Sequence, residues 1–517
     1  MTATTSAHTS VAFDHVDVLV VGAGIAGLSA AYHLKRLQPG RTFAIVDARS
    51  NIGGTWDLFK YPGIRSDADL QTFGFGFKPW RRDNAIADAH EILDYLHETV
   101  EENDLQRHIH LGHKVLKADF STADERWVVT LERAGDGARV DVTATMLFSA
   151  AGYYDYDQGY TPEFEGRNDF GGEIVHPQQW PEDLDHAGKK VVVIGSGATA
   201  VTLIPSIAAS ADHVTMLQRS PSYVLPIPRQ DPIANTLRRF LPAKPAHDLA
   251  RAFNIRRLNV LYGLSQRFPR QMRALVRKIN AASLPEGYPV DTHFNPAYNP
   301  WDQRMCMVPD GDMFKAISDG SASVVTDKIV RFTESGIVLE SGAELEADII
   351  VTATGLRMVP FGKIALAVDG TDVHLPDHVI YKTMMVSDVP NFAFTVGYVN
   401  QAWTLKADLV SAWFCRLLAS MDEHGHASVT PVVSDRSMPL KRYVEMDTGY
   451  VNRAMHLFPK QGTRGPWVAP QSFNRDRVVL GKDPIDDPEL HFTDTKLAPT
   501  TATSSSAEPA FEVVLGE

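Results

Sequence analysis

Two glycine-rich hexapeptides have the residue types and spacing needed to bind the phosphates of a dinucleotide. One reads GAGIAG at 22–27 and follows the apolar stretch Val16–Val21; the other reads GSGATA at 195–200 and follows Lys190–Ile194. In a strand–turn–helix unit the first glycine permits the tight turn, the second lets the backbone approach a pyrophosphate, and a small third residue lets helix and strand pack closely. The helix N-terminus then presents N–H groups to the anion. The predicted binding residues are Gly22, Gly24, Ala26 and Gly27 in the first motif and Gly195, Ser196, Gly197, Ala198, Thr199 and Ala200 in the second.

The residues at the end of the next apolar stretch distinguish the two motifs. Asp47 ends Phe43–Val46 and offers a carboxylate to the hydroxyl groups of a ribose. The corresponding stretch His213–Leu217 offers no carboxylate and is followed by Arg219 and Ser220; an arginine there suits a ribose 2′-phosphate. Two such units in one chain usually hold FAD and a nicotinamide, so that hydride passes from the nicotinamide to the flavin. We therefore predict FAD on the first unit and NADPH on the second.

The elements that must position these motifs alternate along the chain. Short β-branched stretches, with a further one at Asp348–Thr352, alternate with helical patterns, which predicts an α/β fold with parallel strands and crossover helices. We predict two Rossmann-like dinucleotide-binding domains, one for FAD and one for NADP, with a helical insertion in the NADP domain. The expected limits are 16–155 and 381–494 for the two parts of the FAD domain, 156–380 for the NADP domain, about 225–300 for the insertion, and 1–15 and 495–517 for disordered or flexible tails.

The composition is that of a folded acidic protein. The net charge of −13 gives no reason to expect a nucleic-acid partner. No apolar stretch approaches the ~20 residues that span a bilayer, and the first residues lack a basic-then-apolar leader, so we expect no transmembrane segment and a cytoplasmic location. The two cysteines, Cys306 and Cys415, lack CxxC or CxxxxC spacing, which argues against a disulfide framework or a redox pair.

The segment 229–278 is basic within this acidic chain. It contains twelve Lys or Arg residues, opposed only by Asp231 and Asp248. Apolar residues recur there at helical spacing, at Leu237, Leu241, Leu249, Phe253, Leu258, Leu261, Met272 and Leu275. We interpret the segment as helices with solvated basic faces near a phosphate-bearing cofactor; a patch that contacts a membrane surface or docks a partner is the alternative.

The segment between the two glycine motifs carries a family resemblance. Phe170–Pro181, FGGEIVHPQQWP, resembles the Baeyer–Villiger monooxygenase fingerprint FxGxxxHxxxW followed by Pro or Asp. Gly53–Trp56 and Tyr61–Asp67 resemble that family's GGTW and YPGxRxD segments, while Tyr298–Cys306 and Thr404–Asp408 are similar to the mycobacterial ethionamide-activating type. The resemblance covers about residues 16–494. It implies an FAD-containing, NADPH- and O2-dependent enzyme that converts ketones to esters or lactones, with sulfides and thioamides as secondary substrates.

The resemblance also implies roles for particular residues. Arg304 corresponds to the arginine at the flavin face, and Asp67 to the carboxylate that orients it. Reduced flavin and O2 give an anionic C4a-peroxide, and a fixed guanidinium stabilises that charge and the adduct formed on a ketone. Gln303 stands where the family often has a lysine that grips the 2′-phosphate, which implies a weaker preference for NADPH. The implied cofactor contacts are Thr55, Trp56, Asp57, Leu58, Arg65, Ser66, Asp67 and, against the adenine, Val115.

Three other functions compete with this interpretation. A flavin-containing N- or S-monooxygenase is disfavoured by Trp180-Pro181 together with Arg304, and a disulfide reductase by the lack of a cysteine pair after the first glycine motif. A non-catalytic flavin-binding sensor stays open.

The histidines favour structural over chemical roles. We interpret His176 as a linker residue rather than a proton donor. We do not expect His108, His110 and His113 to bind a metal, because no carboxylate or further ligand lies near them. The sequence does not indicate the oligomeric state.

Overall fold

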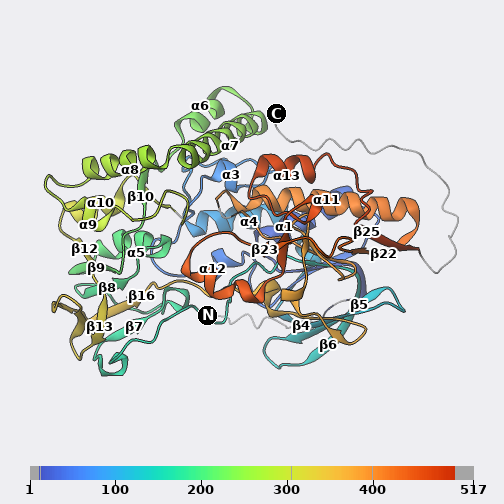
Figure 1. Ribbon diagram of the computed structural model, residues 1–517, viewed down its shortest axis with the longest axis horizontal. Helices are drawn as coiled ribbons and strands as arrows, with labels where there is room; N and C mark the ends of the chain where they lie inside the picture. Colours follow the sequence, from blue (N-terminus) through green and yellow to red (C-terminus); the bar gives the residue numbers. More distant parts are fainter. Residues whose placement is uncertain (1–10, 12, 304, 399, 495–517) are drawn as a thin grey trace, which may run out of the picture.

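A mixed sheet and a parallel sheet, each packed with helices, form the two halves of this protein (Figure 1). The computed structural model describes residues 11, 13–303, 305–398 and 400–494. The predicted fold class, α/β with two dinucleotide-binding units and a helical insertion in the second, is confirmed.

The first sheet is built around β1, which lies parallel to both β2 and β6. Val18 and Val20 face a core shared with helices α1 and α11, whereas Leu19 and Val21 face a second core, so the strand is buried on both faces as central parallel strands are. Strands β17 to β21 join this sheet from much later in the chain, and β21 pairs with β6 in parallel. The strands are β1 (His15–Val21), β2 (Phe43–Asp47), β3 (Ile109–Leu111), β4 (His113–Ser121), β5 (Arg126–Arg133), β6 (Arg139–Ser149), β17 (Ala365–Val368), β18 (Thr371–Asp372), β19 (Ile380–Tyr381), β20 (Met385–Val386) and β21 (Phe392–Phe394); the helices are α1 (Ile25–Leu37), α2 (Thr55–Leu58), α3 (Leu70–Phe73), α4 (Ala89–Glu102) and α11 (Trp403–His424).

The second sheet has five strands, all parallel, in the order β12-β9-β8-β16-β7. Three of its strands, β8, β9 and β16, were predicted from the sequence, as were β1 and β2 of the first sheet. The observed ends of these five strands differ from the prediction by no more than one residue. The fingerprint segment contributes β7 at the edge of this sheet, beside β16. The elements are β7 (Glu173–Val175), β8 (Lys190–Ile194), β9 (His213–Gln218), β12 (Ala322–Thr326), β16 (Ile349–Thr352), the helices α5 (Ala198–Ala208) and α10 (Asp312–Ser318), and the antiparallel strands β13 (Ile329–Phe332), β14 (Gly336–Leu339) and β15 (Glu344–Glu346).

The helical insertion lies between β10 and β11, which pair in parallel. It comprises α6 (Pro232–Phe240), α7 (Ala243–Arg267), α8 (Pro269–Ser283) and α9 (Val290–His293), and β10 and β11 span Val224–Ile227 and Cys306–Pro309. Figure 1 shows α6, α7 and α8 along one outer edge of the molecule. None of the eight apolar residues that indicated these helices is buried. The buried positions of α7 are small or polar, among them Ala246, Ala250 and Asn254.

The last part of the chain packs back on the first sheet. Helices α11 and α13 pack together, and β25 pairs with β22. The elements are β22 (His426–Pro431), β23 (Leu440–Arg442), α12 (Gly449–Ala454), β24 (Lys460–Gly462), α13 (Phe473–Val479) and β25 (Leu490–Asp494). Over the described ranges, no helix has both the length and the apolar character required to cross a membrane.

Candidate functional site

One cavity is lined by residues of both glycine motifs. The first motif contributes Gly22, Gly24 and Ala26, and the second contributes Ala198 and Thr199. Including the part open to solvent, the empty space amounts to about 1480 Å³. These residues follow the carboxyl ends of β1 and β8, where α/β folds bind their ligands. The N-termini of α1 and α5 therefore border the same space.

The first glycine loop has the geometry that a close pyrophosphate contact requires. Gly22 has φ +107°, and a Cβ there would lie 2.6 Å from the carbonyl oxygen of Ala150. A Cβ on Gly27 would lie 1.8 Å from the carbonyl oxygen of Gly22, so only glycine lets α1 approach the turn this closely. Both positions therefore match the roles that the spacing predicts. The loop fits a dinucleotide phosphate.

Asp47 lies at the cavity wall and already binds the loop's backbone. Its Oδ2 accepts a hydrogen bond from the N–H of Ala23 at 2.7 Å, and its Oδ1 accepts one from the N–H of Arg49 at 2.9 Å. Burial raises the pKa of Asp47, an effect that these hydrogen bonds oppose. Each carboxylate oxygen keeps a second lone pair, so contact with a ribose is geometrically open.

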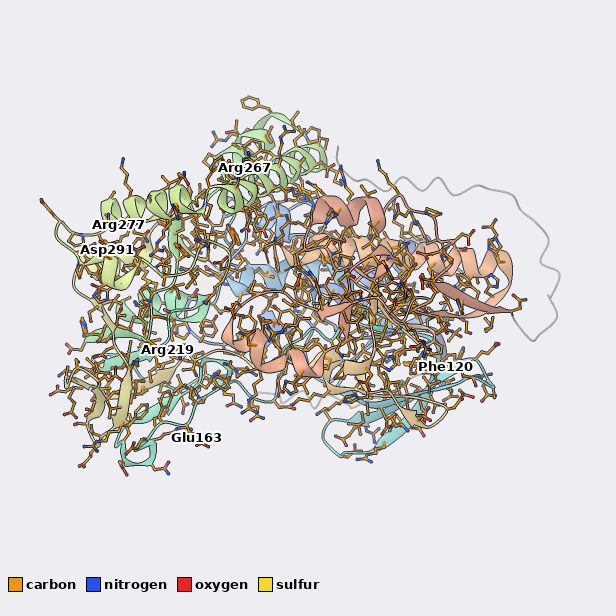
Figure 2. The ribbon with its side chains drawn as sticks, in the orientation of Figure 1. Phe120, Glu163, Arg219, Arg267, Arg277 and Asp291 are labelled. Atoms are coloured by element: carbon orange, nitrogen blue, oxygen red, sulfur yellow. The ribbon has the colours of Figure 1, made fainter. Side chains whose placement is uncertain are left out.

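The second glycine loop resembles the first, but a cation, Arg219, lies beside it where the first loop has the carboxylate of Asp47. Strands β8 and β9 run parallel with Ile194 opposite Leu217, so Arg219 follows the end of β9 beside the loop. Arg219 and Ser220 are exposed, and Arg219 forms no ion pair with any carboxylate in the described ranges (Figure 2). Gln218 is instead buried, and its amide donates to the carbonyl oxygen of His293 and to Thr326 Oγ1, both at 2.8 Å. The arginine is thus the side chain available for an anion.

The structure divides the other predicted cofactor contacts into two groups. Thr55, Trp56, Arg65 and Asp67 line the cavity. The remaining four, Asp57, Leu58, Ser66 and Val115, are not among its lining residues.

The second group has contacts within the protein. Asp57 accepts hydrogen bonds from Arg49 at 2.5 Å, and Ser66 Oγ accepts one from the N–H of Ala87 at 3.1 Å. Val115 lies in the core of the first sheet, opposite Leu131. Their contacts with a cofactor stay predictions.

Arg65 connects the cavity wall to the second half of the molecule. Its guanidinium forms an ion pair with Asp312, the first residue of α10. Arg229 makes a second connection of this kind, through Asp88 at 2.6 Å. These pairs connect the two halves of the molecule.

The predicted catalytic pair is described only in part. Asp67 is exposed on the cavity wall. Arg304 lies outside the described residues. The interaction between the two side chains therefore stays a prediction.

Aromatic residues that the sequence did not single out complete the cavity. They are Phe59, Phe73, Tyr153, Tyr154, Tyr156, Tyr398 and Trp403, and the polar Gln401 lies beside them. Tyr156 and Thr55 share a hydrogen bond of 3.0 Å, and burial raises the pKa of Tyr156 to about 12. The tyrosines at 153–156 follow the carboxyl end of β6, beside that of β1. Predicting β6 from the sequence would have located them.

Tyr398 is held by a buried ion pair behind the cavity. Its hydroxyl donates to Asp476 Oδ2 at 2.6 Å, and Lys406 Nζ donates to the same oxygen at 2.5 Å. The side chains of Lys406 and Asp476 are only 3% and 2% exposed. Burial raises the pKa of Tyr398 and lowers that of Lys406. The pair fixes the orientation of the tyrosine ring at the cavity wall.

The fingerprint segment Phe170–Pro181 contacts both chain segments that connect the two halves, at Asp155 and at Gly355. His176 is not a lining residue of the cavity; its Nε2 lies 3.2 Å from the carbonyl oxygen of Gly355, and its Nδ1 accepts a hydrogen bond from the N–H of Gln178. The Gln178 side chain donates to the carbonyl oxygen of Asp155 at 2.8 Å. Burial lowers the pKa of His176, which favours the neutral ring. The geometry agrees with a linker role.

In the described ranges, the cysteines form no disulfide and the histidines join no metal-binding group. Both cysteines are buried, and neither forms a disulfide. No group of three or more His, Cys, Asp or Glu side chains in these ranges is arranged to hold a metal ion. His108 instead stacks on the ring of Phe43.

The fold and the cavity define a protein with two dinucleotide-binding units that share one site. A family model described as pyridine nucleotide-disulphide oxidoreductase matches residues 19–225, a range without any cysteine. A solved structure titled "Oxidized steroid monooxygenase bound to NADP" has the same fold, with a TM-score of 0.74 and 23% identity over 93% of this chain and 100% of the other. A cyclohexanone monooxygenase from Rhodococcus sp. Phi1, solved bound to NADP+, gives a TM-score of 0.71 with 20% identity over 94% and 100%.

Full-length relatives show the family. The chain is 49% identical over 492 residues to the FAD-containing monooxygenase EthA of Mycolicibacterium smegmatis, covering 95% of this chain and all of the relative. It is 46% identical over 487 residues to the probable FAD-binding monooxygenase AlmA of Acinetobacter baylyi, covering 93% and 97%. The chain belongs to this family of FAD-containing monooxygenases. The prediction of an FAD-containing monooxygenase is confirmed at the level of the family.

Proposed function

We propose that this chain is an NADPH- and O2-dependent monooxygenase of the Baeyer–Villiger type. It inserts one oxygen atom beside the carbonyl of a ketone to give an ester or lactone, and it oxygenates sulfides or thioamides as a side activity. The observation that supports the cofactor arrangement is the single cavity bordered by both glycine motifs. The fingerprint Phe170–Pro181 supports the reaction type.

Each unit holds its own nucleotide in this proposal. The loop at Gly22 and Gly24, with Asp47, binds FAD; the loop at 195–200, with Arg219 and Ser220, binds NADPH. FAD supplies the redox chemistry, accepting hydride from NADPH and activating O2. Because α1 and α5 begin at the same cavity, the two nucleotides can meet there without a large movement of either unit.

The chain's own residues then stabilise charge and exclude water. Arg304 stabilises the negative charge that develops on the carbonyl oxygen of the ketone, and Asp67 orients Arg304. The aromatic wall, including Tyr398 and Trp403, encloses an apolar substrate and limits the access of water. Gln303 provides no cation for the 2′-phosphate, so Arg219 carries most of the selectivity for NADPH.

Product analysis tests the reaction type. The purified chain, supplied with FAD, NADPH and 18O2, is offered cyclic, aliphatic and aryl ketones and an aryl methyl sulfide, and the products are identified by mass spectrometry. We expect esters or lactones that carry one 18O atom. Oxygenation of sulfide without any ester would favour a flavin-containing S-monooxygenase, and no product with any substrate would favour a sensor.

A variant separates the oxygen transfer from the flavin reduction. Arg304→Ala should still allow NADPH to reduce the flavin but should lower ester formation by about a hundredfold or more, because one preorganised charge is lost. Arg304→Lys serves as the charge-conserving control and should retain part of the activity. Ester formation by Arg304→Ala at the rate of the unmodified enzyme would remove this residue from the proposed role.

The two-part FAD domain, the NADP domain and the cytoplasmic location stay parts of the proposal, but residues 365–372, predicted within the NADP domain, form β17 and β18 and pair with the first sheet.

A further inference from the structure

The helical insertion displays large apolar side chains to solvent. Nine of the fifteen exposed large hydrophobic residues in the described ranges lie between 233 and 275. Phe240 at the end of α6 is 80% exposed, and Leu249 and Val260 on α7 are each 53% exposed. The nine are Ile233, Phe240, Leu249, Phe253, Val260, Leu261, Leu264, Phe268 and Leu275, and we call them the exposed apolar surface of α6–α8. A concentration of this kind marks an interaction site more often than chance exposure.

Helix α7 exposes large apolar side chains and buries small or polar ones, the reverse of an ordinary surface helix. Leu249, Phe253, Val260 and Leu264 recur at spacings of four, seven and four residues, so they form one stripe along the helix. That stripe faces solvent, whereas the buried side is made of Ala246, His247, Ala250, Asn254 and Ser265. An amphipathic helix normally buries its apolar stripe. The orientation of α7 is therefore not explained by the folding of this chain alone.

Polar contacts fix this orientation. Arg251 Nη1 donates to the carbonyl oxygens of Gln71, Thr72 and Gly74 at the end of α3, at 2.7 to 3.0 Å. Asn254 donates to Asp69 Oδ1 at 3.0 Å and to Asp231 Oδ2 at 2.9 Å. Rotating α7 to bury its apolar stripe would break all of these bonds. The apolar side chains are thus held outward by the structure.

Cations surround the exposed apolar surface. Helices α6–α8 carry eleven Lys or Arg residues and a single carboxylate, Asp248, which pairs with Lys244. Six of the cations are exposed and form no ion pair with any carboxylate in the described ranges: Arg239, Arg256, Arg257, Arg267, Arg270 and Lys278. Figure 2 labels Arg267, the last residue of α7, which is exposed. Apolar side chains bordered by unpaired cations fit the boundary between lipid headgroups and acyl chains.

We propose that α6–α8 dock this enzyme on the surface of an anionic lipid bilayer. The apolar side chains enter the boundary of the acyl chains, and the unpaired cations bind headgroup phosphates. A second copy of the chain fits less well, because a two-fold contact through this surface would place like charges against each other. The surface also lies along an outer edge of the molecule, where a planar membrane can reach it (Figure 1).

Helix α7 also contacts the wall of the cavity. Gln401, a lining residue, donates a hydrogen bond to Asn259 Oδ1 on α7 at 2.6 Å. The end of α3 that Arg251 binds includes Phe73, another lining residue. Docking would therefore hold the cavity one helix away from the lipid. Delivery of apolar substrates from the bilayer rests on the proposed function, but docking itself does not.

Vesicle flotation tests the docking without any turnover. The full chain loaded with FAD is mixed with vesicles of equal parts phosphatidylglycerol and phosphatidylcholine, or of phosphatidylcholine alone, at low and high salt. We expect flotation with the anionic vesicles, weakened by salt and by removal of phosphatidylglycerol. Two variants probe the two components: Arg256→Glu/Arg267→Glu/Arg270→Glu and Leu249→Ser/Phe253→Ser/Leu264→Ser. Each should lower binding by roughly tenfold or more.

A control variant on β13 and measurements of folding and oligomeric state accompany the flotation experiment. Val330→Ser/Arg331→Glu exchanges an exposed apolar residue and an exposed cation on β13, away from the helices, and should bind vesicles as the unmodified chain does. All substituted residues are exposed, so circular dichroism and FAD content should stay unchanged. No flotation with anionic vesicles, or equal flotation of all variants, would overturn the proposal. A dimer in gel filtration that the α7 variants dissociate, without vesicle binding, would assign the surface to a second copy instead.

Discussion

At the scale of single residues, this chain assigns its two nucleotides through side chains that follow equivalent strands. Asp47 is the last residue of β2 in the first unit and binds the glycine loop, whereas Arg219 follows β9 in the second unit and is exposed without a carboxylate partner in the described ranges. One unit thus presents an acceptor of hydrogen bonds and the other a cation. A ribose and a ribose 2′-phosphate require these two different groups.

Replacing Arg219 should change the choice between the two nicotinamide nucleotides. We expect Arg219→Ala to raise KM for NADPH by about tenfold or more and to leave KM for NADH nearly unchanged, because a charge-assisted contact to the 2′-phosphate is lost. Steady-state kinetics with both nucleotides measure the effect, and Arg331→Ala, an exposed arginine on β13, is the control. An equal change for both nucleotides would contradict the assignment of Arg219.

At the scale of elements, close packing positions the cofactor loops, and polar contacts position the insertion. Helix α1 approaches its turn so closely that a side chain at Gly27 has no space. Helix α7 is instead held by Arg251, Asn254 and His247, whose imidazole lies within hydrogen-bonding distance of Gln71 and of the carbonyl oxygen of Phe75. The first interaction is sensitive to volume and the second to protonation.

A methyl group at position 27 should displace α1 from the glycine turn. We expect Gly27→Ala to lower the free energy of unfolding by about 1–3 kcal/mol, as overpacking does, and to reduce the FAD content of the purified protein. Thermal unfolding and the flavin absorbance measure the two effects. Gly40→Ala is the control, since a Cβ there meets no atom within 4 Å. Normal FAD content in Gly27→Ala would show that the close approach is dispensable.

His247 should make the stability of the folded chain, through the packing of α7 against the segment 71–75, dependent on pH. Burial lowers the pKa of His247 to about 3 in the folded chain, well below its ordinary value of 6.5. The unfolded chain therefore binds more protons below pH 6.5, and the stability that the neutral histidine permits is lost as the pH falls, by about 2 kcal/mol at pH 5. Thermal unfolding between pH 7.5 and 5 should show a shallower pH dependence in His247→Gln. The exposed His424→Gln should not differ from the unmodified chain.

Elements with a local sequence pattern could be predicted, and features that depend on distant parts of the chain could not. The strand β8 was predictable because Val191, Val192 and Val193 form a continuous apolar stretch after a charged residue. The three-residue β21 was not, since it is too short for any periodic pattern. The helices of the insertion were predictable from their spacing, but their orientation was not, because it depends on Gln71, Asp69 and other partners far away in the chain. Tyr153, Tyr154 and Tyr156 were missed because β6, the strand that they follow, was itself not predicted.

At the scale of the whole molecule, the cavity exists only where the two units meet, so cofactor binding and overall stability are linked. FAD should stabilise the folded chain by about 2.7 kcal/mol at a concentration a hundred times its Kd. Thermal unfolding of protein depleted of flavin, with and without added FAD, measures this. Riboflavin, which lacks the pyrophosphate that the loop at Gly22 binds, should stabilise far less. A colourless preparation that FAD does not stabilise would contradict the assignment of the cavity.

The late strands of the first sheet have a consequence for how the chain folds during synthesis. Leu147 of β6 pairs with Phe392 of β21, and Lys117 of β4 pairs with Ala365 of β17. The five strands of the second sheet, from 173 to 352, lie between these partners. The first sheet, whose early strands are synthesised first, therefore lacks β17 and β21 until nearly 250 further residues have been synthesised. All five strands of the second sheet are available before that point. Non-local pairing of this kind is slow, and an uncovered edge invites association with other chains. We expect nascent chains that end before residue 365 to depend on chaperones, and the flavin site to be the last part of the molecule to form.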